Sequence, residues 1–251
     1  MIKVFVDLEK IKQIIKLFLD LKRIKFDDKN FHTNFNIDIN VEAIELFEQL
    51  NVKLNCLNEA IVREDRVAVK AFMIYLRGSM MQISSLFYAL HEDLDLLLES
   101  LSESHFDLES TRMPISQKYQ NKFEKEGINL DVDLNIFKSI MHKLILFEET
   151  KIFDKIYPLE YQGDLNQFLV ENINELGKNL EFFYCDFIHN RIINSKFFLQ
   201  KSCGVLQRLF VFFDFLRDEI EGVLWADSTS FPDIPESYQI PDSYNYPKKM
   251  L

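Results

Sequence analysis

Glycine is scarce in this sequence, which has only six glycines and six prolines in 251 residues. Proteins contain about 7% glycine on average, and both residue types interrupt regular structure by forming turns. Four of the six prolines lie near the C-terminus, at Pro232, Pro235, Pro241 and Pro247. Because the rest of the chain has so few turn-forming residues, we expect long elements, which favours helices.

Cysteine is also rare, and its positions suit neither a metal site nor a disulfide framework. The three cysteines, Cys56, Cys185 and Cys203, are odd in number, and none of them forms a C-x-x-C spacing. This pattern argues against a zinc knuckle and against paired disulfides, and it indicates free thiols in a reducing compartment. We therefore expect a cytoplasmic protein with no cofactor and no metal.

Familiar catalytic motifs are missing from the chain. It contains no G-x-x-x-x-G-K, no G-x-G-x-x-G and no G-x-S-x-G sequence. The nearest approach to a site is CDFIHNR, residues 185–191, in which Asp186 and His189 would be neighbours on a helix. Glu171 and Glu175 share their predicted face, which indicates the solvated side. Asp186 and His189 are therefore weak catalytic candidates, and the sequence argues more against an enzyme than for one.

The longest apolar run, AFMIYLRGSMMQISSLFYAL at residues 71–90, contains a single charge, Arg77. Its arginine, glutamine and serines argue against a transmembrane segment. On a helix, Arg77 would continue a stripe that begins with Arg63, Arg66 and Lys70. Three interpretations stay open: a side chain that faces water, a structural ion pair, for which Asp214 and Asp186 are the candidate partners, or a bound anion. Arg208 is a further candidate for either role.

The acidic balance of the chain points to a class of partner. The net charge is −11 and the isoelectric point is about 5.0, which argues against direct nucleic-acid binding because phosphate contacts need clustered Lys and Arg. At helical spacing, four carboxylates line one face: Glu92, Asp95, Glu99 and Glu103. They belong to an acidic run without Lys or Arg that we call the acidic ridge: Glu92, Asp93, Asp95, Glu99, Glu103, Asp107 and Glu109. It predicts a solvated surface, a dock for a basic protein, or a decoy that imitates nucleic acid.

Apolar periodicity predicts a succession of helices. We expect helices over residues 7–25, from about Asn40 as an N-cap, over 64–101, over 133–157, from Asp164, and over 196–225. A short strand at residues 1–6 has no evident partner. The sequence thus predicts an all-α, antiparallel bundle of about six or seven helices with one long central helix. Residues 1–225 are expected to form a single domain.

The C-terminal segment, residues 226–251, is expected to be an extended tail. Its prolines exclude regular helix, and its aromatic side chains supply hydrophobic contact points at Phe231, Tyr238, Tyr244 and Tyr246. Extended Pro- and aromatic-rich segments dock into grooves of partner proteins. The alternative is that the tail folds back and covers apolar surface of its own body.

These observations favour a non-enzymatic interaction protein, such as an inhibitor, immunity factor, adaptor or regulator. Its partner would be a protein, and a basic one would suit the acidic ridge; a homodimer is also compatible with the long apolar seams. Two alternatives stay open. One is a helical enzyme or ligand sensor with a polar site around Arg77, and the other is the acidic decoy.

Overall fold

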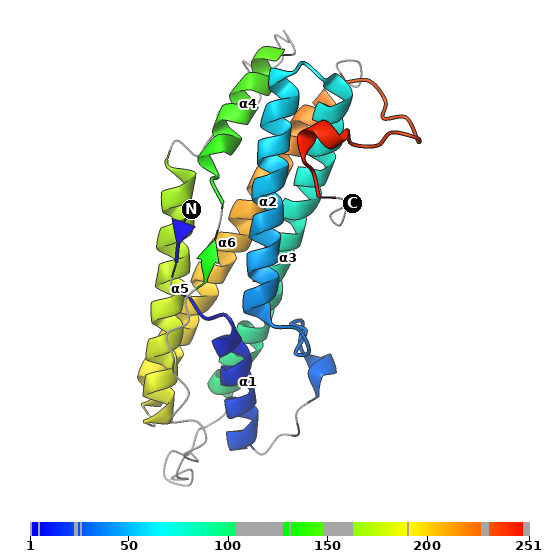
Figure 1. Cartoon of the computed structure of the whole chain (residues 1–251). Helices are drawn as coiled ribbons and strands as arrows, with labels where there is room; N and C mark the ends of the chain where they lie inside the picture. Colours follow the sequence, from blue (N-terminus) through cyan, green and yellow to red (C-terminus); the bar gives the residue numbers. More distant parts are fainter. Residues whose placement is uncertain are drawn as a thin grey trace.

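The computed structural model describes residues 2–4, 6–22, 25, 27–103, 128–130, 132–147, 163–189, 191–226 and 231–247. Within these ranges the chain forms six α-helices that lie side by side in an elongated bundle (Figure 1). The helices are α1 Glu9–Lys22, α2 Ile39–Val62, α3 Arg66–Glu103, α4 Asn135–Phe147, α5 Leu165–Ile188 and α6 Ile192–Ala226. The predicted all-α helical bundle is confirmed.

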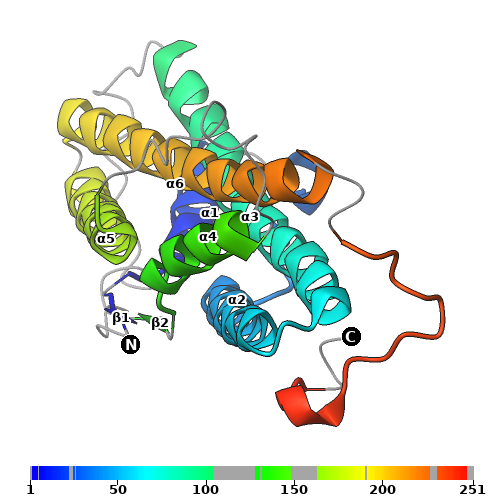
Figure 2. The same ribbon diagram turned by 90° about the horizontal axis from the view of Figure 1, so that it is seen from above.

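The central helix α3 has 38 residues and packs most extensively on α6 and α2. Apolar residues that recur along α3 mostly at steps of three and four, the spacing of a helical bundle seam, are all buried: Ala68, Phe72, Leu76, Ile83, Leu86, Leu90, Leu94, Leu97 and Leu101. Figure 2 shows α6 crossing α3 on one side of the bundle, with α2 on the other side. Between α2 and α3 the chain reverses at Glu64, whose φ of 56° is left-handed, and Asp65 accepts a hydrogen bond from the Ala68 amide at 3.1 Å.

One continuous cluster of buried apolar residues runs through all six helices. Phenylalanine fills much of it, and Phe213 of α6 contacts both Phe47 of α2 and Phe87 of α3, with ring centroids 5.6 and 6.0 Å apart. Broad aromatic rings fill the space between long helices, which agrees with the 24 phenylalanines of the sequence.

A two-stranded antiparallel ladder joins the N-terminus to the segment before α4. Strand β1, Ile2–Lys3, pairs with β2, Asn129–Leu130, so that Ile2 lies opposite Leu130. The sequence indicated a strand at the N-terminus but no partner for it. The partner strand is only two residues long, which is too short for an alternating pattern to reveal.

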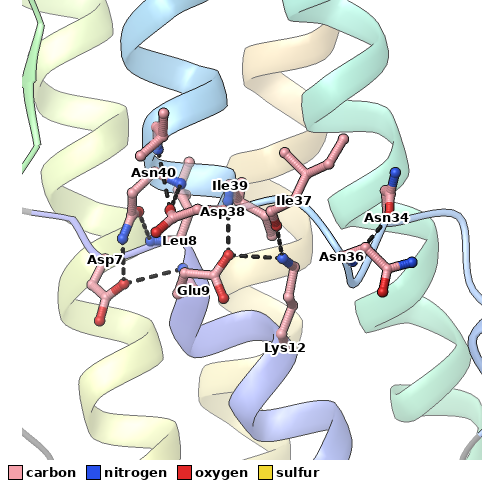
Figure 3. Close-up of polar contacts among 11 residues, drawn as sticks. Asp7, Leu8, Glu9, Lys12, Asn34, Asn36, Ile37, Asp38, Ile39 and Asn40 are labelled. Carbon is pink, nitrogen blue, oxygen red and sulfur yellow. Dashed lines mark hydrogen bonds and ion pairs between the residues drawn. The ribbon is translucent and has the colours of Figure 1, made fainter.

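The N-cap of α2 differs from the prediction. Asp38, not Asn40, caps the helix: its Oδ1 accepts the amides of Asn40 and Val41 at 2.9 and 3.1 Å. Asn40 instead connects two helices (Figure 3), because its Oδ1 accepts the Leu8 amide at 2.8 Å and its Nδ2 donates to Asp7 at 2.8 Å. Both residue types are good caps, so local sequence alone does not separate them.

Glu9 and Lys12 complete this junction between α1 and α2 (Figure 3). Glu9 Oε1 accepts the Ile39 amide at 2.7 Å and the Lys12 ammonium at 2.8 Å. Lys12 is buried and also donates to the Ile37 carbonyl. The start of α1 is thus tied to the start of α2 through satisfied polar groups, as burial of a charge requires.

Other helix ends differ from the expectation by a few residues. Helix α5 begins after Asp164, which caps it as expected by accepting the Gln167 amide at 3.0 Å. The predicted helix over 133–157 is seen as Asn135–Phe147: it begins two residues later than expected, and positions 148–157 lie outside the described residues. None of the helices in the described part of the chain combines the length and the apolar composition needed to cross a bilayer.

Candidate functional site

Two polar contacts cross the interface between α3 and α6 near its outer edge. Arg77 of α3 forms an ion pair with Glu221 of α6, and Ser84 donates to Asp214 at 2.9 Å. We expected Asp214 or Asp186 as the partner of Arg77, and the ion pair forms with Glu221 instead. The Arg77 side chain is 40% exposed, so the guanidinium lies at the surface beside a carboxylate.

Asp214 is held by its own helix as well. Arg217 donates to Asp214 and to Asp218, both at 2.8 Å. The hydrogen bond to Asp218 is the main reason why the pKa of the Arg217 guanidinium is raised above its ordinary value. These charges satisfy one another at the surface, an arrangement typical of structural ion pairs.

Exposed apolar side chains alternate with these polar contacts. On α3, Ile74, Met81 and Tyr88 are 41%, 46% and 45% exposed and lie seven residues apart. On α6, Val211 and Trp225 are 51% and 76% exposed and lie fourteen residues apart. Multiples of seven return to the same side of a helix. We call these residues, together with Arg77, Asp214 and Glu221, the α3–α6 face.

The antiparallel register of the two helices brings the apolar rows alongside each other. The Tyr88 ring packs edge-on against Phe210, with centroids 5.5 Å apart, which places Val211 beside the Tyr88 turn. Ile74 precedes Arg77 by one turn, and Trp225 follows Glu221 by one turn, so both lie at the far end of the face. From Ile74 to Tyr88 the face is about 21 Å long, at 1.5 Å per residue.

The acidic ridge continues this face toward the end of α3. Glu99 is exposed, Glu92 and Asp95 are half-buried, and Glu103 is the last residue of α3. His91 Nδ1 lies 3.4 Å from a Glu92 carboxylate oxygen. The ridge is therefore less uniformly solvated than its spacing predicts, and Glu99 is the exposed one among its carboxylates whose side chains are described; Asp107 and Glu109 lie outside the described residues.

Asp93 was expected to belong to the acidic ridge, and the structure corrects this, because Asp93 has a structural role instead. It is fully buried, and its two oxygens accept the backbone amides of His32 and Thr33 at 2.7 and 2.9 Å. This carboxylate orders the loop between α1 and α2 against α3. A hint was available, since position 93 falls off the polar stripe and beside Leu94.

The weak catalytic candidates do not form a pair. Asp186 is buried, which contradicts the solvated position expected for it, and it forms an ion pair with Arg191 at 2.7 Å. His189 is exposed at the C-terminal end of α5, where its Nδ1 lies 2.6 Å from the Cys185 carbonyl oxygen. Helical spacing alone placed Asp186 outside, but the return of the chain into α6 covers it.

Arg208 joins α6 to α5 on another side of the bundle. It donates to Asn172 at 2.8 Å and to Glu175 at 2.7 Å, and the Arg208 and Glu175 side chains are both about half exposed. This geometry is that of a surface ion pair between neighbouring helices. It does not bring Arg208 to Arg77 or Asp214.

The tail packs on its own body, which is one of the two alternatives that the sequence left open. Phe231, Tyr244 and Tyr246 are buried, and Tyr238 is half-buried. The Tyr244 ring contacts Phe72 at 5.3 Å between centroids, and its hydroxyl donates to Asp65 at 2.9 Å. Buried in this way, Phe231, Tyr244 and Tyr246 do not face a partner.

Basic residues near the turn between α2 and α3 reinforce the tail contact. The Arg63 guanidinium lies 4.7 Å from the centre of the Tyr244 ring and donates to the Ser243 hydroxyl at 2.9 Å. Lys70 forms an ion pair with Asp233 at 3.2 Å. The basic end of the stripe that contains Arg77 is therefore used to hold the tail.

A buried lysine is the remaining polar feature of interest. Lys53 of α2 donates to the Ser79 hydroxyl at 2.6 Å, and burial lowers the pKa of its ammonium. The signal in the sequence was a lysine on the apolar side of α2, between Leu50 and Leu54. Lys53 and Ser79 do not line the cavity of about 220 Å³ between α1 and α3. The residues that line this cavity include Phe18, Phe31 and Leu97.

Metal-binding side chains do not gather in the part of the chain described here: no group of three His, Cys, Asp or Glu residues is close enough to hold an ion. Comparison with protein-family models, with curated proteins and with solved structures gives no match. A proposal about function therefore depends on the surface and contacts of this chain alone.

Proposed function

We propose that this protein is a non-enzymatic, cytoplasmic interaction module that binds a partner protein through the α3–α6 face and the adjoining acidic ridge. The observation that carries the proposal is the exposure of five apolar side chains in register along two packed helices. Exposed apolar patches bordered by polar residues are typical of protein interaction sites, and a row at seven-residue spacing suits contact with a helix.

The charged residues on this side of the molecule indicate which kind of partner would bind. Arg77, Asp214 and Glu221 are occupied within the chain, whereas Glu99 projects from the same side of α3. A basic partner would be attracted to the ridge, and its apolar residues would cover Met81, Tyr88 and Val211. Electrostatic attraction of this kind chiefly raises the association rate and weakens with salt.

The other two functions have less support. A site around Arg77 needs an accessible guanidinium in a cavity, and Arg77 is paired with Glu221 at the surface. A nucleic-acid decoy needs carboxylates displayed evenly, and Glu92 and Asp95 are half-buried. A second copy of the chain is a possible occupant of the α3–α6 face, and the experiment below distinguishes it from another protein.

The test compares surface variants of the tagged full chain, purified from its source cells. Met81→Glu places a charge in the middle of the α3–α6 face, and Glu99→Lys reverses the exposed end of the ridge. Val62→Glu is the matched control, because Val62 is an exposed apolar residue at the end of α2. Mass spectrometry measures the proteins recovered with each variant, and circular dichroism checks folding.

We expect one stoichiometric protein to be recovered with the wild type and with Val62→Glu. Met81→Glu should reduce its recovery by about tenfold, the effect of about 1.4 kcal/mol, and Glu99→Lys should reduce it more at low salt than at high salt. A chain that is recovered alone, or a partner that tolerates both face variants, would contradict the proposal. Recovery of the untagged chain would identify a second copy as the occupant.

A further inference from the structure

The elbow between α5 and α6 presents apolar side chains that the α3–α6 face does not include. Helix α5 ends at Ile188 and α6 begins at Ile192, so the two helices meet through a very short connection. Figure 1 shows this elbow at one end of the bundle, opposite the end where the tail packs. Side chains on the outside of the elbow therefore project from one end of the bundle that the described residues form.

Four apolar residues make up the elbow patch. Ile193 in the first turn of α6 is 84% exposed, and Phe182 and Phe197 are each 52% exposed. Phe198, half-buried, joins them: its ring stacks on Phe182 at 5.0 Å and meets Phe197 edge-on at 5.3 Å. Three of these four side chains are more than half exposed, so they are available to enter a soft surface.

The charges around the patch are opposite in sign to those of the whole chain. Between residues 178 and 201 the sequence has four basic residues and two acidic ones, although the chain carries a net charge of −11. Lys178 and Lys201 are exposed, and the Lys201 ammonium lies 5.5 Å from the centre of the Phe197 ring. Asp186 and Arg191 form an ion pair, which leaves three lysines, at positions 178, 196 and 201, against one exposed carboxylate, Glu181.

Helical spacing places these lysines beside the aromatic rings. Lys178 precedes Phe182 by one turn of α5, and Lys201 follows Phe197 by one turn of α6. The elbow thus combines protruding apolar residues with a basic rim.

We propose that the elbow is a docking site for an anionic membrane surface. Apolar and aromatic side chains would enter the boundary between headgroups and acyl chains, while the lysines would contact lipid phosphates, as at other interfacial helices. Its exposed apolar side chains together with its basic rim therefore favour an anionic membrane, which offers both an apolar interior and phosphate groups.

The cysteines supply a specific probe for this docking. Cys185 is exposed and lies one turn from Phe182, whereas Cys56 and Cys203 are buried. An environment-sensitive fluorophore attached to Cys185 in the full chain would report entry of the elbow into an apolar environment. Trp225, the one tryptophan of the sequence, lies at the opposite end of α6 and serves as an internal control.

The experiment titrates the labelled chain with vesicles of phosphatidylcholine and phosphatidylglycerol in equal parts, and with vesicles of phosphatidylcholine alone. With the anionic vesicles only, we expect the fluorescence of the Cys185 probe to shift to the blue and to increase in intensity. The emission of Trp225 should change little. Ile193→Ser should weaken vesicle binding about tenfold and Lys201→Gln about fivefold. Val62→Ser changes another strongly exposed apolar residue, 69% exposed at the far end of the bundle, and should leave binding unchanged.

Ile193→Ser is a safe variant because Ile193 packs little and serine is well tolerated near a helix N-terminus. The membrane proposal is overturned if anionic vesicles leave the Cys185 probe unchanged, or if Ile193→Ser binds as well as the wild type. A probe that responds to poly-glutamate and not to vesicles would also overturn it, in favour of an acidic protein segment. These outcomes do not depend on the α3–α6 face.

Discussion

The structural role of a charged residue in this protein depends on the partner that folding brings next to it. Arg77 is the only charge in a run of twenty residues, yet Glu221, 144 positions away, neutralises it at the surface. Asp93 and Asp186 show the converse: they belong to polar stretches of sequence and are buried. Each is satisfied by donors, the backbone amides for Asp93 and Arg191 for Asp186, as buried carboxylates must be.

The three thiols are expected to differ in reactivity for the same reason. Burial is the main cause that raises the pKa of Cys56 to about 11 and that of Cys203 to about 12, and the thiolate is the reactive form. Iodoacetamide should therefore modify Cys185 first in the folded protein, and all three cysteines in urea. Peptide mass spectrometry over time measures this order. Simultaneous modification of Cys56 or Cys203 under native conditions would contradict the burial.

At the scale of elements, the tail acts as part of the body. Tyr244 and Tyr246 cover Phe72 and Tyr75 of α3, with ring centroids between 5.3 and 6.1 Å apart. Asp65 serves two elements at once, since it accepts the Ala68 amide at the start of α3 and the Tyr244 hydroxyl. Deleting the tail would uncover this surface, so point variants are the cleaner way to study partner binding.

Two variants of Tyr244 distinguish how much packing and how much hydrogen bonding contribute to the stability of this contact. Tyr244→Ala removes a buried ring and should lower the free energy of unfolding by about 3–5 kcal/mol, whereas Tyr244→Phe removes one hydrogen bond and should cost about 1 kcal/mol. Urea denaturation measures both. Tyr238→Phe is the control, because the Tyr238 hydroxyl has no hydrogen-bond partner among the described residues. Equal effects of Tyr244→Ala and Tyr238→Phe would mean that the tail contributes little.

At the scale of the whole molecule, stability is expected to fall in alkali. Burial is the main cause that raises the pKa of Tyr244, and it also raises the pKa of Tyr246 to about 12. Because the folded pKa values exceed the unfolded ones, this stabilisation is complete below about pH 9–10 and is lost as the pH rises through the folded values. The raised pKa values of Cys56 and Cys203 likewise make the stability of the folded chain fall as the pH rises.

Urea midpoints at about pH 8 and about pH 11 measure this loss, and the alkaline midpoint should be the lower one. Tyr246→Phe removes one of the ionising groups and should make the pH dependence shallower. A midpoint that does not change over this range would show that these groups ionise equally easily in the folded and unfolded chain.

The surface of the whole molecule is divided by charge and apolar exposure. The α3–α6 face combines exposed apolar rows with the carboxylates of the ridge, and the elbow combines exposed apolar residues with lysines. The two surfaces would attract partners of opposite sign. A protein that binds a basic partner with one surface and an anionic membrane with the other would bring that partner to the membrane.

Helices, the buried stripe of α3 and the cap at Asp164 were predictable from the sequence, because each depends on residues within a few turns of one another. Local pattern did not decide between Asp38 and Asn40 as a cap, and it did not find β2. The ion pair of Arg77, the burial of Asp186 and the fold-back of the tail join segments that meet only after the helices pack. Cys56 and the Tyr244 carbonyl, 188 positions apart and in contact, illustrate the physical reason. Such contacts depend on how complete helices fit together, which only the tertiary structure decides.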